Sequence, residues 1–161
     1  QLTIAVNLSA RQLAQPDIAE VISKIIRSSG APAQRLKLEI TESMLLTDID
    51  KTIGKLDALS ALGIRFSLDD FGTGYSSLSY LKKLPLSQLK VDQSFVKGLL
   101  TEPVDAAIVK TIIQLARSLG MTVIAEGVEL EGQRKALADM GCREFQGYLF
   151  GKPAPLPACT P

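Results

Sequence analysis

Acidic and amide side chains, and one lysine, recur where the sequence predicts that its strands end. The residues concerned are Asn7, Glu39, Asp69, Lys90 with Asp92, Glu126 and Gln146. In a (β/α) barrel the carboxyl ends of the strands converge on one rim, where the active sites of such barrels are built. Several carboxylates crowded at that rim would repel one another strongly unless cations neutralised them. The pattern therefore predicts a metal site at one end of a ring of strands.

The chain offers oxygen ligands for such cations. It has no histidine, and its two cysteines, Cys142 and Cys159, lack the spacing of a disulfide framework or a zinc site. We therefore expect hard cations, Mg²⁺ or Mn²⁺, with Asn7 adding a carbonyl oxygen. Two such ions suit phosphodiester hydrolysis, because they bind phosphate oxygens, acidify the attacking water and stabilise the leaving oxygen. Lys90 could orient that water or offset the charge of the transition state.

The pair Asp69-Asp70 is the strongest single signal in this set. A lone strand-end Asp or Glu is often a helix N-cap or a solvated loop residue. Two adjacent carboxylates, in contrast, are unfavourable without a cation. Successive strand residues face opposite ways, so both can reach one site only if the strand ends or bulges there. Gly72 and Gly74, which follow closely, permit such a distortion.

Short β-rich runs alternate with amphipathic helical stretches along the whole chain. The expected strands cover residues 2–8, 36–40, 64–69, 88–92, 122–126 and 142–147. The expected helices cover residues 16–29, 48–62, 77–82, 105–119 and 130–140. Alternation of this kind indicates parallel strands joined by right-handed crossovers.

Each expected strand has one apolar face and one polar face. Leu36, Leu38 and Ile40, for example, alternate with Lys37 and Glu39. A doubly wound sheet, which helices cover on both sides, would be apolar on both faces. One polar face per strand instead favours an α/β fold of the (β/α) TIM-like barrel type, with a lumen that is polar near its mouth.

The composition limits the classes of partner. Across 161 residues, 18 Lys and Arg balance 17 Asp and Glu. This balance argues against DNA or RNA as a partner, because nucleic-acid binding needs a net basic face, but it leaves room for a small anionic ligand. Scarce cysteine and the lack of an apolar run of about 20 residues or a signal peptide predict a cytoplasmic location.

Six segments of this chain resemble the signature segments of the EAL domain family, in that family's order. They are Val6–Gln12, Leu38–Ser43, Leu68–Ser77, Leu89–Val96, Ile124–Glu129 and Gln146–Pro153. The resemblance covers nearly the whole chain. It implies a modified barrel that cleaves one phosphodiester bond of cyclic di-GMP to give linear pGpG, with two Mg²⁺ or Mn²⁺ ions as cofactors and Ca²⁺ as an inhibitor.

The resemblance also implies roles for individual residues. The implied metal ligands are Asn7, Glu39 and Asp69, with Asp70 shared with the second metal. Lys90 would contact the catalytic water, and Glu126 would be a ligand or base near it, supported by Gln146. The implied substrate-binding residues are Asp92, Glu129 and Pro153. Glu42 would hold the loop after Asp70, a segment that couples dimerisation to metal binding in this family.

One departure from the family is large. The Glu-Ala-Leu segment, whose Glu is a metal ligand, does not occur in this sequence. A full barrel has eight strands in about 250 residues, and six are expected here. We therefore expect a truncated EAL domain over residues 1–153, with two strands lost before Gln1, and an irregular tail over residues 154–161. Such a fragment would bind metal poorly and be inactive or weakly active.

The resemblance further suggests a homodimer and a parent protein with an upstream sensor or GGDEF (diguanylate cyclase) domain, which could be tethered to the inner membrane. Two other functions compete with the enzyme. One is a non-catalytic receptor or regulatory EAL domain, although that class usually lacks the carboxylates retained here. The other is a sugar-phosphate or carboxylate-handling barrel with one Mg²⁺ and Lys90 as a Schiff-base lysine. Lys90 could also be merely a structural partner of Asp92 or Glu126.

Overall fold

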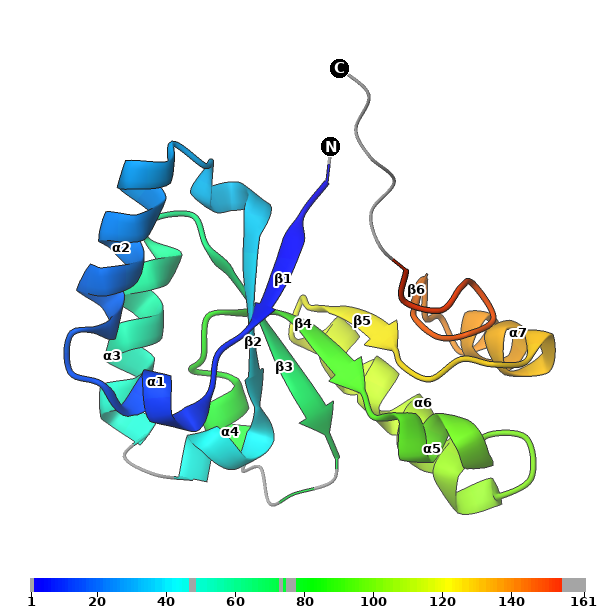
Figure 1. Ribbon diagram of the computed structural model, residues 1–161. Coiled ribbons are helices and arrows are strands. Elements are labelled where there is room, and N and C mark those ends of the chain that lie inside the picture. The colour runs from blue at the N-terminus through cyan, green and yellow to red at the C-terminus, as the bar shows by residue number, and fades with distance from the viewer. Residues whose placement is uncertain (1, 47–48, 73, 75–77, 155–161) are drawn as a thin grey trace.

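Six parallel strands form a single sheet in the order β1-β2-β3-β4-β5-β6. The computed structural model describes residues 2–46, 49–72, 74 and 78–154. The strands are β1 (Ile4–Asn7), β2 (Leu36–Thr41), β3 (Arg65–Phe71), β4 (Leu86–Val91), β5 (Thr122–Ala125) and β6 (Glu144–Phe145). Because each crossover adds the next strand on the same side, the sheet follows the course of a barrel wall (Figure 1). This confirms the predicted incomplete barrel.

Helices follow the strands and cover the outside of the sheet. The α-helices are α1 (Ala10–Ala14), α2 (Ile18–Ser29), α3 (Ile49–Ser60), α4 (Leu78–Leu81), α5 (Gln93–Gly98), α6 (Pro103–Ser118) and α7 (Glu131–Asp139), with 3-10 turns η1 (Ala33–Arg35) and η2 (Glu42–Leu46). In Figure 1, α2 and α3 lie side by side next to the early strands, whereas α6 lies against β4 and β5. No helix within the described ranges combines the length and apolarity needed to cross a membrane.

The hydrophobic core lies between the sheet and these helices. Leu38, Phe66, Leu68 and Leu89 face it, and each is at most 4% exposed. Strand residues of the opposite parity point into the lumen, as the alternation in the sequence predicts. The sheet thus separates an apolar outer layer from a polar inner one, which is the arrangement that a polar active-site mouth requires.

The boundaries of several elements differ from the predicted ones. The strand predicted over residues 142–147 is limited to β6, and the one predicted over 64–69 continues to Phe71. The short helices α1 and α5 were not predicted. A capping box between Ser9 and Gln12 begins α1, and the Asp92 side chain accepts a hydrogen bond from the Ser94 N–H at the start of α5. The predicted helix starts at Asp48 and Ser77, and residues 155–161 of the predicted tail, lie outside the described residues.

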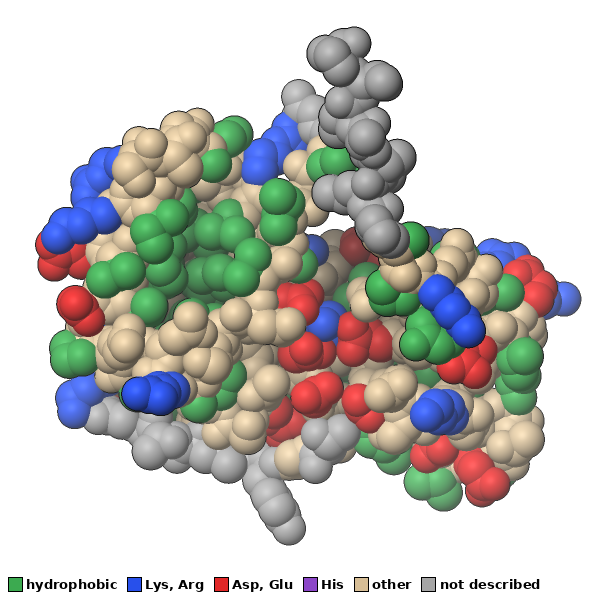
Figure 2. Space-filling model, in the orientation of Figure 1, with side chains coloured by type: hydrophobic (Ala, Val, Ile, Leu, Met, Phe, Trp, Pro, Cys, Tyr) green, Lys and Arg blue, Asp and Glu red, His purple; other side chains and the backbone are tan. Residues whose placement is uncertain are grey.

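The edge of the sheet at β1, together with the neighbouring helix α2, presents an exposed apolar surface. Within the described residues β1 pairs with β2 alone, and Ile4 and Val6 on β1 are 66% and 45% exposed. On α2, Val21 and Ile25 are 37% and 58% exposed. Figure 2 shows apolar side chains gathered over the part of the molecule where Figure 1 places β1 and α2. Exposed apolar patches beside an unpaired strand edge promote association.

We therefore expect the 161-residue chain to self-associate through this surface in a concentration-dependent way. The substitution Ile25→Lys should weaken that association at least about tenfold, because it would place a charge in an apolar contact. Sedimentation velocity over a range of concentrations measures the effect. The control is Val104→Lys, which changes an exposed apolar residue on α6. A wild-type chain that stays monomeric, or equal effects of the two variants, would contradict this expectation.

Candidate active site

Lys90 is the centre of an ionic cluster at the carboxyl ends of the strands. Its Nζ lies 3.0 Å from Glu39 Oε2, 3.0 Å from Asp69 Oδ1 and 2.8 Å from Glu126 Oε1. The lysine is only 5% exposed. Figure 2 shows acidic side chains around a basic group in the middle of the visible face. The predicted convergence of charged strand ends on one rim therefore occurs.

Strand register explains how residues distant in sequence reach this point. Lys90 lies on β4, Glu39 on β2 and Asp69 on β3, all with side chains on the lumen side. Glu126 directly follows β5, and its N–H donates to Val91 O at 3.1 Å. That hydrogen bond continues the β4–β5 pairing by one residue, so the Glu126 side chain points into the lumen like that of Lys90.

A backbone irregularity lets Asp69 and Asp70 face the same site. The register of β3 against β4 shifts between Leu68 and Phe71, and Asp70 has a φ of 54°. Aspartate is among the few non-glycine residues that adopt this left-handed conformation at moderate cost. The Asp70 N–H donates to Asp69 Oδ1 at 3.0 Å. The distortion that two adjacent carboxylates need for a shared site is thus present.

Asp69, Asp70 and Glu126 form a group able to hold a metal ion. Each offers a carboxylate oxygen, and the three oxygens lie within 4.8 Å of one another. These three carboxylates and Glu39 surround a single lysine, so the cluster carries excess negative charge. Hard divalent cations prefer oxygen ligands and would neutralise that excess. The residues present therefore fit a hard divalent metal.

The ionisation of the cluster reflects crowding and burial. Burial raises the pKa of Glu126, and the charges of Asp69 and Glu39 raise it further against the opposing effect of Lys90. Burial also raises the pKa of Asp70, together with the charges of Asp69 and Asp92. For Lys90, burial acts to lower the pKa, but hydrogen bonds to three carboxylates outweigh it and the pKa is raised. Lys90 therefore remains an ammonium ion at neutral pH.

The substitution Asp70→Asn is expected to stabilise the metal-free chain by a few tenths of a kcal/mol at pH 7, because solvent screens much of the repulsion at this partly exposed carboxylate. A carboxyl group whose pKa is raised in the folded state destabilises that state once it ionises. The gain should therefore grow as the pH rises through the ordinary Asp range and vanish well below it. Urea unfolding in EDTA at several pH values measures it.

The variant Asp70→Ala distinguishes the effect of the Asp70 charge on stability from the effect of its backbone conformation. Alanine also removes the charge, but it tolerates a φ of 54° less well than asparagine does. The alanine variant should therefore be less stable than the asparagine variant at every pH. An asparagine variant that is less stable than the wild-type chain in EDTA would contradict the account of Asp70.

Glu42 anchors the loop that follows Asp70. It begins η2 and is 4% exposed, and its Oε2 accepts hydrogen bonds from the N–H groups of Gly72 at 3.1 Å and Gly74 at 3.3 Å. A Cβ at position 74 would lie 3.0 Å from the Glu42 carboxyl group. The carboxylate therefore fixes the backbone directly behind the Asp69-Asp70 pair, and a larger residue at Gly74 would crowd it.

The remaining predicted residues lie at the same end of the strands. Asn7 is exposed on β1 and pairs in register with Glu39. The Gln146 N–H donates to Ala125 O at 2.8 Å, which places Gln146 beside the end of β5. Asp92 directly follows β4 and interacts with Asp70 as well as capping α5.

Two predicted substrate-binding residues, Glu129 and Pro153, are exposed and lie after β5 and β6. The Glu129 N–H donates a hydrogen bond to Gln133 Oε1 at 2.9 Å, and the Glu129 carboxylate takes no part in that contact. The structure thus brings Glu39, Asp69 and Glu126 into direct contact with Lys90, whereas neither Glu129 nor Pro153 is among the residues that contact this lysine.

A second polar layer lies deeper in the lumen and was not predicted. Gln88, in the middle of this layer, is 3% exposed. Its Oε1 accepts hydrogen bonds from Lys37 Nζ at 2.9 Å and Ser67 Oγ at 3.2 Å. Its Nε2 donates a hydrogen bond to Glu144 Oε2 at 2.8 Å. It ties β2, β3 and β6 to β4 beneath the Lys90 cluster. The sequence feature that could have indicated this layer is the position of Gln88 two residues before Lys90, because residues two apart lie on the same face of a strand.

Comparison with known proteins identifies similar domains. The family model for the EAL domain matches residues 1–153. The bifunctional diguanylate cyclase/cyclic di-GMP phosphodiesterase MucR of Pseudomonas aeruginosa is 45% identical over 152 residues, which are 94% of this chain and 22% of MucR. The cyclic di-GMP phosphodiesterase NbdA of the same organism is 43% identical over 158 residues, which are 98% of this chain and 20% of NbdA. The chain thus spans about a fifth of the length of these curated relatives.

Solved structures agree with the fold. The PaMucR phosphodiesterase in complex with cyclic di-GMP superposes with a TM-score of 0.92 at 45% identity, over 96% of this chain and 62% of that one. Klebsiella pneumoniae BlrP1 with manganese and cyclic di-GMP at pH 9.0 gives a TM-score of 0.85 at 33% identity, over 94% of this chain and 39% of BlrP1. BlrP1 is also known as a complex with calcium and cyclic di-GMP.

Proposed function

This chain belongs to the EAL domain family, and from that premise we propose that its Lys90 cluster is part of a site that hydrolyses cyclic di-GMP to linear pGpG. The observation that carries the proposal is the group formed by Asp69, Asp70 and Glu126, with oxygens within 4.8 Å of one another beside Lys90. The relatives MucR and NbdA, named as cyclic di-GMP phosphodiesterases, support it.

The proposed cofactors are two Mg²⁺ or Mn²⁺ ions. Asn7, Glu39 and Asp69 would hold one, with Asp70 shared with the second and Glu126 as a further ligand or as the base near the catalytic water. Such ions, when bound, polarise a phosphodiester and lower the pKa of a water molecule. The manganese complex of BlrP1 supports manganese, and its calcium complex is compatible with Ca²⁺ occupying such a site as an inhibitor. Calcium prefers more ligands at longer distances than magnesium does, which would misplace the reacting groups.

The chain's own residues have distinct tasks in this reaction. Lys90, held as an ammonium ion, can donate a hydrogen bond to the attacking water or to a phosphate oxygen, and it cannot act as a base. Glu126, whose pKa is raised, is the better acceptor for the proton of that water. Gln146, beside the end of β5, would help to orient Glu126. Asp92, Glu129 and Pro153 would contact the nucleotide.

The charge of Lys90 also argues against a Schiff-base barrel enzyme. A lysine that forms a Schiff base must lose its proton, and proteins achieve this by lowering its pKa. Three carboxylate contacts have the opposite effect here. A non-catalytic receptor remains the competing function, because binding of cyclic di-GMP does not itself require Glu126 or Lys90 to take part in a reaction.

Incubation of the chain with cyclic di-GMP and Mn²⁺, followed by chromatography for pGpG, tests the proposal. We expect slow hydrolysis that stops in EDTA and is far below the rate of the MucR phosphodiesterase assayed in parallel. The reason is that β1, among the residues that the structure describes, pairs only with β2 and leaves an open edge next to Asn7. Brisk turnover would contradict the proposed weak activity. Tight nucleotide binding that is equal with Mn²⁺ and with EDTA, without any pGpG, would contradict the enzyme and favour the receptor.

We further propose that the protein acts in the cytoplasm, as a homodimer, in a parent that carries a sensor or GGDEF domain and could be tethered to the inner membrane. MucR, which is named for both diguanylate cyclase and phosphodiesterase activities, supports such a domain combination. The near balance of basic and acidic residues supports a small nucleotide, and not DNA or RNA, as the ligand.

A further inference from the structure

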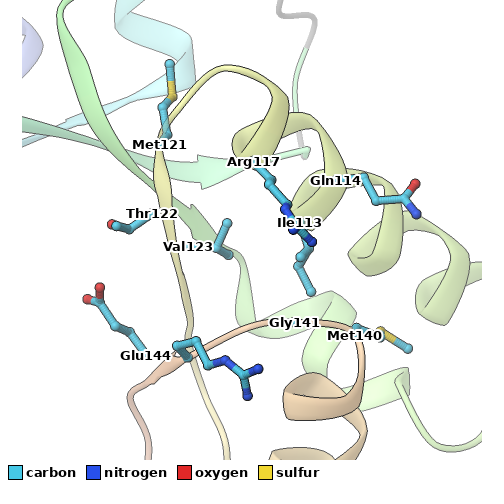
Figure 3. Close-up of a pocket in the computed structure, with 10 residues that line it drawn as sticks. Ile113, Gln114, Arg117, Met121, Thr122, Val123, Met140, Gly141 and Glu144 are labelled. Carbon is cyan, nitrogen blue, oxygen red and sulfur yellow. The ribbon is translucent and has the colours of Figure 1, made fainter.

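A second cavity lies at the opposite end of the strands from the Lys90 cluster. It has a volume of about 450 Å³ and lies among the C-terminal part of α6, the end of α7 and the beginnings of β5 and β6 (Figure 3). Thr122 and Glu144, which line it, are the first residues of β5 and β6, whereas Glu126 and Gln146 follow the ends of those strands. The cavity is therefore separate from the proposed active site.

The lining of this cavity has an apolar part and a basic part. Ile113 from α6, Val123 from β5 and Met140 after α7 form the apolar part. Arg117, in the last turn of α6, and Arg143, just before β6, contribute two guanidinium groups. Pockets for small organic molecules in proteins typically combine apolar walls with a few polar groups and have volumes of about 300–1,000 Å³.

The two arginines lack the carboxylate partners that surface arginines often have. In the described part of the chain neither the Arg117 nor the Arg143 guanidinium group makes a hydrogen bond or ion pair, whereas that of Arg134 on α7 pairs with Glu131. Glu144 is the acidic residue in the lining, but its Oε2 accepts a hydrogen bond from Gln88. In Figure 3 its carboxylate points away from Arg117. The positive charge of the cavity is therefore not compensated from within its lining.

We propose that this cavity binds a small organic phosphate, with the phosphate group between Arg117 and Arg143 and the organic part against Ile113, Val123 and Met140. A phosphate dianion matches two guanidinium groups in charge, and the planar fork of each arginine suits bidentate binding of phosphate oxygens. The apolar wall favours an aromatic or aliphatic body over inorganic phosphate alone. This inference does not depend on the proposed phosphodiesterase activity.

The test uses phenyl phosphate as the probe and the full 161-residue chain in EDTA. Without a metal, the acidic cluster at the other end of the strands repels a phosphate, so binding there does not interfere. Saturation-transfer NMR gives the affinity, and amide shifts of Val123 and Gly141 report on the cavity itself. Arg117→Gln and Arg143→Gln should each weaken binding about tenfold, and the double variant should bind no better than background. Both side chains are exposed, so these variants should fold, as circular dichroism can verify.

Arg134→Gln is the matched control, because it removes an arginine of α7 that is already paired and does not line the cavity. It should leave the affinity for phenyl phosphate unchanged, and benzyl alcohol should bind much more weakly than phenyl phosphate. Shifts of the Val123 and Gly141 amides in the wild-type chain would support the proposal even if a variant failed to fold. Unchanged binding by the double variant, an equal loss in Arg134→Gln, or equal affinity for benzyl alcohol would overturn it.

Discussion

Replacing Lys90 with methionine is expected to lower the free energy of unfolding by roughly 3 kcal/mol in EDTA at pH 8, because removing one partner of a buried ionic cluster leaves its charges uncompensated. Glu39, Asp69 and Glu126 all contact the Lys90 ammonium group, and their side chains are 14%, 16% and 17% exposed. Urea denaturation followed by circular dichroism measures the loss.

The loss should be smaller at about pH 5 than at pH 8. The raised pKa of Lys90 keeps this residue charged over that range, so the wild-type contribution does not change through Lys90 itself. In the variant Glu126, whose pKa burial raises, can take up a proton as the pH falls, which relieves part of the repulsion. Added Mn²⁺ should also restore part of the lost stability, because a cation would replace the ammonium group.

Lys37→Met is the matched control for this prediction. Lys37 is also a lumen-facing lysine, but its Nζ donates to the neutral Gln88 Oε1 at 2.9 Å. Its removal should cost no more than about 1–2 kcal/mol and should show little dependence on pH between about 5 and 8. Equal losses in the two variants, or a Lys90 variant as stable as the wild-type chain, would show that the cluster does not depend on its central cation.

Replacing Asp69 with asparagine is expected to weaken Mn²⁺ binding at least about 100-fold relative to the unsubstituted chain, since even an outer-shell partner is worth about 10–100-fold. Asp69 lies within the group of oxygens that could hold the ion and also contacts Lys90. The amide keeps the shape of the side chain but loses its charge. The electron paramagnetic resonance signal of free Mn²⁺ in a titration measures the affinity.

Glu144→Gln is the control for the effect of Asp69. It removes a lumen carboxylate of β6 that contacts Gln88 and lies at the other end of the strands. The affinity for Mn²⁺ should change less than about twofold, because Glu144 belongs neither to the group of oxygens that could hold the ion nor to the residues that contact Lys90. A similar loss in both variants would mean that Mn²⁺ responds to the overall charge of the lumen and not to a defined site.

The fold could be predicted because apolar residues that face the core alternate with polar residues that face the lumen along the strands. In β2 the residues Leu38 and Ile40 are apolar and buried, as are Phe66 and Leu68 in β3, and they alternate with Lys37, Glu39, Ser67 and Asp69. This alternation excludes a sheet that is covered on both faces, and it also places the charged residues on one side. The predicted strand ends therefore already contained the members of the site.

The particular contacts within the site could not be predicted in this way. The sequence offered Asp92 or Glu126 as a structural partner of Lys90, and the structure pairs Lys90 with Glu126 while Asp92 caps α5. Which carboxylate reaches Lys90 depends on the sheet register, and register is a property of strand pairs. The capping residues Ser9 and Asp92 were visible in the sequence, but their helices are too short to show a periodic apolar pattern.

The account depends most on a metal ion shared by the acidic residues next to Lys90. Anomalous diffraction from crystals of the chain soaked in a high concentration of Mn²⁺ tests this directly. We predict an anomalous peak within about 2 Å of carboxylate oxygens from Asp69, Asp70 and Glu126. Peaks that lie elsewhere, with no manganese beside these three carboxylates, would contradict it.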